Sequence, residues 1–169
     1  MTRRVLGLLV MCALAMVGVA QEEHHAAMPT HPGYAMLSKL AGEWEGPSDF
    51  GSMKAVFKIT AAGSTVMQTL DPGGQYEMVT MFHGDGAEIM ATHFCSGRNQ
   101  PRMRTVKTND PKVLRFEFVD GTNLKGSGYI NGLQITFVDD DHHIEEWTSV
   151  DASGKPTPPL KVQMTRKKS

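Results

Sequence analysis

Two stretches of the chain decide its fold: VLRFEFVDG at residues 113–121 and LQITFVDDD at residues 133–141. In the first stretch, Leu114, Phe116 and Phe118 occupy alternate positions, and charged side chains stand between them. A period of two is typical of a β-strand that has one face in an apolar core and the other in water. Both stretches end in Asp or Gly residues, which favour turns. They predict two strands of an antiparallel sheet.

The same alternation recurs along most of the chain, for example at residues 53–60 and 160–164. Turn residues separate these runs at residues 72–74, 84–86, 109–111, 120–121, 139–141 and 153–156. We count about ten short strands, at the spacing expected of an all-β sandwich or barrel. Closure hides the edges of so long an antiparallel meander. The predicted fold is therefore all-β, a closed antiparallel barrel of about ten strands.

One short helix is predicted in front of the barrel. Met36, Leu37 and Leu40 lie at helical spacing, and Gly42 follows as a stop signal. A barrel with this number of strands encloses more space than side chains need to fill, as in barrels that hold one small ligand. The architecture therefore points to the binding of a small molecule.

The start of the chain predicts export. Residues 1–20 carry two arginines, then an apolar run, then small residues at the end. The run is shorter than the ~20 apolar residues that a membrane-spanning helix needs. We therefore predict a cleaved signal peptide, a mature protein that begins at Gln21, no membrane span after cleavage, and a periplasmic or secreted location. Residues 21–32 are predicted to be a flexible segment, and residues 33–169 a single barrel domain.

Charge and cysteine content narrow the possible partners. The chain has 17 Lys and Arg against 18 Asp and Glu, and loss of Arg3 and Arg4 with the signal peptide leaves 15 against 18. An acidic balance argues against nucleic acid as a partner. Cys12 would leave with the signal peptide, so Cys95 has no partner for an internal disulfide. We expect Cys95 to be buried and unreactive. Oligomeric state is not determined by these features.

The opening HPGYAMLSKLAGEWEG, at residues 31–46, resembles the start of lipocalin-like, or calycin, barrels. Further on, residues 78–103, 118–126 and 138–148 resemble a family of secreted bacterial proteins with that fold, known as a domain of unknown function. The resemblance implies a barrel of about ten strands with a lipocalin-like interior.

A more distant resemblance connects the chain to the nitrobindins, which bind haem through a histidine near the C-terminal strand. Here the last strand, PLKVQMTRKK, contains no histidine, and the last candidates are His142 and His143. Adjacent residues of a strand point to opposite faces, so only one of these two can face the interior. A haem- or metal-binding barrel is the first alternative function.

The candidate ligand-binding residues are concentrated in residues 83–102. His93 and Cys95 share one face of a predicted strand and could ligate a soft metal, with His83 as a further ligand. The same pair could serve a hydrolase-like enzyme, the second alternative. That activity needs direct contact between thiol and imidazole, and an oxyanion hole. Two residues at positions i and i+2 of one strand are poorly placed for direct contact between their side chains, so we predict no catalytic residues.

The loop after this strand brings Asn99, Gln100 and Arg102 close together in the sequence. At a barrel mouth, such amides and a guanidinium could clamp a carboxylate. Glu145 and Glu146 are adjacent, so they face opposite ways and cannot act as a paired acid and base. Methionines in the predicted strands suit either an adaptable cavity or an irregular core. The function predicted from sequence is the binding of a small apolar or amphipathic ligand inside the barrel, and no cofactor is specified.

Overall fold

The computed structural model describes residues 31–48 and 51–168. The signal peptide predicted for residues 1–20, and most of the flexible segment after it, lie outside the described residues. Within them the chain forms one α-helix, a short 3-10 turn and ten strands: α1 (Pro32–Lys39), β1 (Gly42–Ser48), β2 (Gly51–Thr60), η1 (Ala61–Gly63), β3 (Thr65–Leu70), β4 (Met78–Asp85), β5 (Glu88–Phe94), β6 (Gln100–Val106), β7 (Val113–Thr122), β8 (Tyr129–Phe137), β9 (His142–Val150) and β10 (Leu160–Arg166). None of the helices described there has the length and apolarity to span a membrane.

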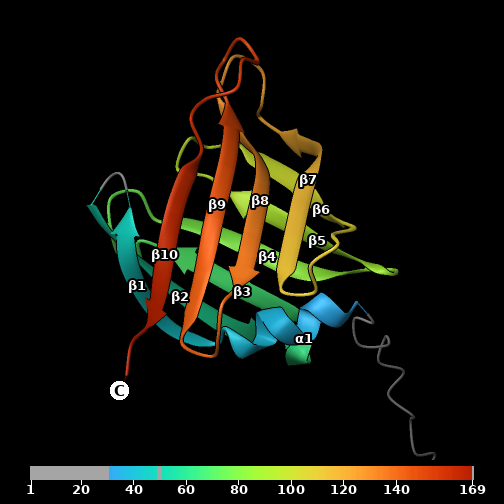
Figure 1. Ribbon diagram of the computed structural model, residues 1–169. Coiled ribbons are helices and arrows are strands. Elements are labelled where there is room, and N and C mark those ends of the chain that lie inside the picture. Colours follow the sequence, from blue (N-terminus) through green and yellow to red (C-terminus); the bar gives the residue numbers. More distant parts are fainter. Residues whose placement is uncertain (1–30, 49–50, 169) are drawn as a thin grey trace, which may run out of the picture.

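The strands close into one antiparallel barrel, as the sequence predicts. Each strand pairs with the next along the chain, and β1 pairs with β10 to complete the ring, where Trp44 stands opposite Arg166. Figure 1 shows β7 to β10 in front and β3 to β5 behind them. Closure satisfies the backbone groups that an open sheet would leave at its two edges.

Helix α1 lies across one end of the barrel, the lower end in Figure 1. It begins at Pro32, because proline is suited to the first turn and the His31 ring accepts a hydrogen bond from the Gly33 amide at 3.0 Å. Apolar side chains at helical spacing then turn towards the barrel, and Leu37 is fully buried. The Tyr34 hydroxyl donates to the Gly63 carbonyl at 2.8 Å and ties the helix to the β2–β3 connection.

The alternation in the sequence separates the core from the surface. On β7, Leu114 and Phe116 are buried inside the barrel, while Arg115 and Glu117 are exposed on the outside. The Trp44 ring at the end near α1 donates to the Leu40 carbonyl at 2.7 Å, which satisfies its buried N–H. Helix and barrel therefore share one hydrophobic core.

The backbones of β1 and β10 approach each other closely at Gly46. A Cβ atom at this position would overlap the carbonyl oxygen of Gln163. We expect Gly46→Ala to lower the free energy of unfolding by about 3 kcal/mol, because backbone rather than a flexible side chain would have to move. Gly97→Ala is the matched control, since the added Cβ would meet only ordinary contacts of 3.5 and 3.6 Å. Urea unfolding of both variants measures the difference, and equal stabilities would contradict the close approach.

Candidate functional site

A buried carboxylate occupies the middle of the barrel. Glu145 is fully buried and accepts hydrogen bonds from three side chains. Gln68 Nε2 donates to both carboxylate oxygens at 2.7 and 3.0 Å, His143 Nε2 donates at 3.0 Å, and Trp147 Nε1 donates at 2.9 Å. Since each donor is itself buried, the carboxylate is held by side chains of the interior.

The bond between Gln68 and Glu145 crosses the barrel. Gln68 lies on β3 and Glu145 on β9, and β2, β1 and β10 lie between them around the ring. Side chains from facing walls therefore meet inside the barrel.

Three of the four hydrogen-bonded side chains come from β9, because alternate residues of this strand point into the barrel. His143, Glu145 and Trp147 occupy every second position and are buried, whereas His142 is exposed and Glu146 faces outward. The prediction that Glu145 and Glu146 face opposite ways is confirmed. The ring of His143 packs edge-on against Trp44, with centroids 4.4 Å apart.

A second histidine lies in the same interior. Register pairs Gln68 with Thr80 and Thr80 with His93, so the three inward side chains form a row across β3, β4 and β5. His93 Nδ1 shares a hydrogen bond of 2.9 Å with Thr80 Oγ1, and its ring lies 5.3 Å from that of Trp147. Burial lowers the pKa of His93 to about 4, so its imidazole is neutral at physiological pH.

Three polar atoms of this interior are buried without a hydrogen-bond partner: Gln68 Oε1, His93 Nε2 and His143 Nδ1. Each such atom costs about 1–3 kcal/mol relative to a satisfied one. Gln68 and His93 belong to the same row, and neighbouring strands lie about 4.8 Å apart. One bound molecule could therefore reach both.

The end of the barrel opposite α1 is apolar and incompletely covered. Four inward side chains near this end pack on the core but remain partly exposed: Met53, Met78, Ile130 and Leu160. They stand at the starts of alternate strands, above the row of polar groups. This end is the open side of the candidate site.

Of the predicted candidates, only His93 takes part in this site. Cys95 follows β5 and is half-buried rather than buried, with its sulfur accepting from the Gly97 amide at 3.4 Å. The imidazole of His93 is bonded to Thr80 and not to the thiol, so the dyad required by the hydrolase alternative is not formed. His83 faces outward on β4, away from His93. Across residues 31–48 and 51–168, no three His, Cys, Asp or Glu side chains are grouped to hold a metal.

Asn99 and Gln100 connect two loops. Asn99 is buried, and its Nδ2 donates to Ser127 Oγ at 3.1 Å and to the Gly128 carbonyl at 2.9 Å. Gln100 Oε1 accepts from the side chains of Thr122 and Asn123. These bonds fasten the β5–β6 turn to the β7–β8 loop.

Arg102 does not line the barrel mouth, so its predicted role there is wrong. On β6 the inward positions belong to Pro101 and Met103, and Arg102 points outward. Its Nε and Nη2 donate to the carboxylate of Asp120 at 2.6 and 2.5 Å. This hydrogen-bonded guanidinium lowers the pKa of Asp120. The pair borders a shallow hollow of about 530 Å³ on the outer surface.

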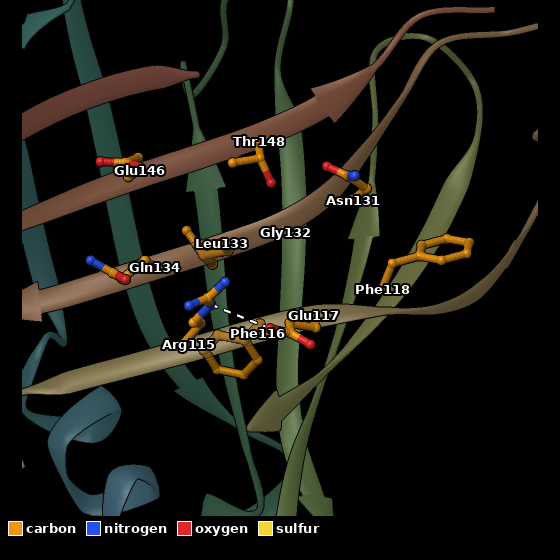
Figure 2. A pocket seen from close by; sticks show the side chains of 10 residues that line it. All are labelled: Arg115, Phe116, Glu117, Phe118, Asn131, Gly132, Leu133, Gln134, Glu146 and Thr148. Atoms are coloured by element: carbon orange, nitrogen blue, oxygen red, sulfur yellow. Dashed lines mark ion pairs between the residues drawn. The ribbon is translucent and has the colours of Figure 1, made fainter. Parts of the chain in front are cut away.

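Another hollow, of about 520 Å³, lies where β7 and β8 separate (Figure 2). Pairing of these strands ends at Glu117 and Gly132, next to a bulge in β8. Most side chains that line the hollow are polar, and Arg115 and Glu117 form an exposed ion pair of 3.4 Å. None of the predicted site residues lines it.

Comparisons with known proteins support the fold alone. No family model and no curated protein matches the chain. A protein of unknown function from the DUF3598 family of Nostoc punctiforme is 14% identical with a TM-score of 0.56, over 78% of this chain and 48% of that one. Rv2717c from M. tuberculosis is 13% identical with a TM-score of 0.55, over 81% of this chain and 98% of that one. The chain spans about half the length of the first protein. The resemblance to calycin barrels holds at the level of a closed ten-strand barrel.

The depressed pKa of His93 predicts acid sensitivity. Between the ordinary value of 6.5 and the folded value of about 4, the unfolded chain binds a proton that the folded chain does not. The free energy of unfolding should therefore fall as pH falls through this window, by up to about 3 kcal/mol from this residue. His93→Asn should remove that share of the pH dependence while keeping a polar partner for Thr80. Urea unfolding at a series of pH values measures it, and identical slopes for both proteins would contradict the prediction.

The buried carboxylate of Glu145 predicts that the same substitution has different effects on stability at Glu145 and at Glu146. Glu145→Gln turns one acceptor into a donor that faces donors, and we expect a loss of about 3 kcal/mol in the free energy of unfolding. Glu146→Gln changes an outward side chain by the same chemistry and should stay within about 0.5 kcal/mol of the wild type. Thermal and urea unfolding compare the two, and a Glu145→Gln protein as stable as the control would refute the donor arrangement.

Proposed function

We propose that the protein binds a small, mainly apolar molecule at the end of the barrel opposite α1. The observation that carries this proposal is the pair of buried, unpartnered atoms, Gln68 Oε1 and His93 Nε2, in one row of the interior. Partly exposed apolar side chains stand above them, including Met53 and Met78. A bound molecule with one polar group would satisfy the row and cover this end.

The proposed ligand is a hydrogen-bond donor rather than a carboxylate. Glu145 places a carboxylate inside the barrel, and Gln68 Oε1 can only accept. A ligand carboxylate would add a second anion to an interior of low dielectric constant, where like charges repel strongly. The cation expected to attract such an acid, Arg102, lies outside and is already paired with Asp120. An alcohol or an amine therefore suits the interior better.

Flexible side chains at the open end support entry. Methionine has three rotatable side-chain bonds and adapts to irregular shapes. Met53 and Met78 are both partly exposed there, so movement of their side chains would uncover the polar row without disturbing the strands. We propose that they form the adaptable part of the site.

A haem or single metal ion is the second candidate, favoured by one feature of His93. One ring nitrogen is held by Thr80, and the other is buried and free, which is how proteins prepare an imidazole as a metal ligand. His93 would hold such a group through Nε2, and the group would supply redox or gas-binding chemistry. An absorption spectrum of the protein mixed with haem distinguishes this candidate from an organic ligand.

Binding can be tested with three probes of one chain length: dodecanol, dodecylamine and dodecanoate. Titration calorimetry should show that the alcohol or the amine binds more tightly than the acid, by about tenfold for one additional hydrogen bond. His93→Leu should lower the affinity for the favoured probe by a similar factor. Arg102→Ala, on the outer face, is the control and should leave every affinity unchanged. No binding of any probe, or tightest binding of the acid with dependence on Arg102, would overturn the proposal.

A further inference from the structure

The outer surface of β3, β4 and β5 gathers three thioethers and one imidazole. These side chains belong to Met67, Met81, His83 and Met90. They face outward, because the residues that alternate with them are buried inside the barrel, among them Val66, Phe82 and Ile89. The group therefore lies on the opposite face of the sheet from the interior row.

Strand register places the four side chains in one patch. Met67 is the direct partner of Met81, and His83 is the direct partner of Met90. Met81 and His83 are two residues apart on β4. Met67 on β3 is therefore directly opposite Met81 and diagonal to His83. Met90 on β5 is directly opposite His83 and diagonal to Met81. Such neighbours lie about 4.5–5.5 Å apart when direct and about 7–8 Å apart when diagonal. A methionine side chain is long enough to reach a common point from these positions.

The imidazole of His83 is prepared for coordination. Its Nδ1 donates to the Gly84 carbonyl at 3.0 Å, since a carbonyl oxygen can only accept. This bond fixes the tautomer and leaves the lone pair of Nε2 free, the arrangement that metal-binding histidines use. The ring is only partly exposed, so neighbouring side chains restrict its orientation.

Burial supports the clustering of the thioethers. Met90 points away from the core, yet only 6% of its surface is exposed. Its neighbours on the outer surface must therefore lie over it. Met67 and Met81 are partly exposed, which leaves a path from solvent to the sulfurs.

We propose that Met67, Met81, His83 and Met90 form a binding site for a soft univalent cation, Cu(I). Thioether sulfur selects Cu(I) over hard cations, and imidazole also suits copper. The group contains no carboxylate, which argues against calcium and magnesium. One cation borders the group: Lys58 is paired opposite Met67, whereas the charge of Arg104, paired opposite Met90, is offset by Asp85 at 2.9 Å. A single positive charge is repelled less by this setting than a double one.

The site can be tested with the full mature chain carrying Cys95→Ser, so that the free thiol does not compete. Cu(I), kept reduced with ascorbate, is titrated against a chromophoric Cu(I) chelator. We expect one equivalent that is lost or weakened at least tenfold in Met81→Leu, in Met90→Leu and in His83→Gln, on the order of the effect of removing a metal ligand or its support. Met78→Leu is the matched control, because Met78 lies on the same strand but faces the interior, and its affinity should be unchanged.

X-ray absorption at the copper edge provides a readout independent of affinity. The bound ion should show sulfur scatterers together with one imidazole, and Met81→Leu should reduce the sulfur contribution. Copper surrounded only by nitrogen and oxygen, or equal Cu(I) affinity in all variants, would overturn the proposal and place the binding elsewhere, for instance at His24 and His25. Circular dichroism of each variant confirms that the barrel is retained.

Discussion

The carboxylate of Glu145 is the constraint on which the interior depends. It accepts hydrogen bonds from its own strand, through His143 and Trp147, and from the far wall, through Gln68. The bond to Gln68 fixes how the two walls face each other. It also fixes the register of β9, because a slip by one residue would bring Ile144 and Glu146 inside and turn all three polar groups out. Closure of the barrel and placement of its polar groups are therefore coupled.

Stability alone does not explain this polar centre. Well-packed apolar side chains often replace a buried ionic group with no loss of stability, or with a gain. Here three further polar atoms stay unpartnered around it, including His93 Nε2 and Gln68 Oε1, and each carries an additional cost. A row that is expensive to bury and lies next to an incompletely covered end is better explained by a partner that completes it. This reasoning supports the binding function that we propose.

Local alternation was sufficient to predict the strands, because each depends on a period of two within one strand. The closed barrel followed from the number of strands and from the need to pair their edges. Alternation did not predict the outward direction of the Arg102 side chain. Which face a residue of β6 occupies depends on the conformation of the preceding turn, residues 95–99, and this is not visible in the alternation. The contact of Gln68 with Glu145 joins positions 77 residues apart, and no local pattern contains it. The sequence HHIEEWT, residues 142–148, does show that His143, Glu145 and Trp147 occupy alternate positions. With Trp147 in the core, this spacing indicates that the carboxylate of Glu145 also points inward.

The same alternation divides chemistry between two surfaces of one sheet. On β4, Thr80 contributes to the interior row, while Met81 and His83 face outward. Met78 and Met81 are three residues apart, so a spacing that would bring them together on a helix separates them on a strand. Methionine content therefore has no single meaning here: Met53 and Met78 belong to the open end, and Met67, Met81 and Met90 to the outer surface. Because the two groups share only the backbone of the sheet, the chemistry on one surface can change while the residues that hold the barrel closed stay the same. A likeness of fold at 13–14% identity is compatible with this separation, since it reports the shared scaffold and not the side chains on either surface.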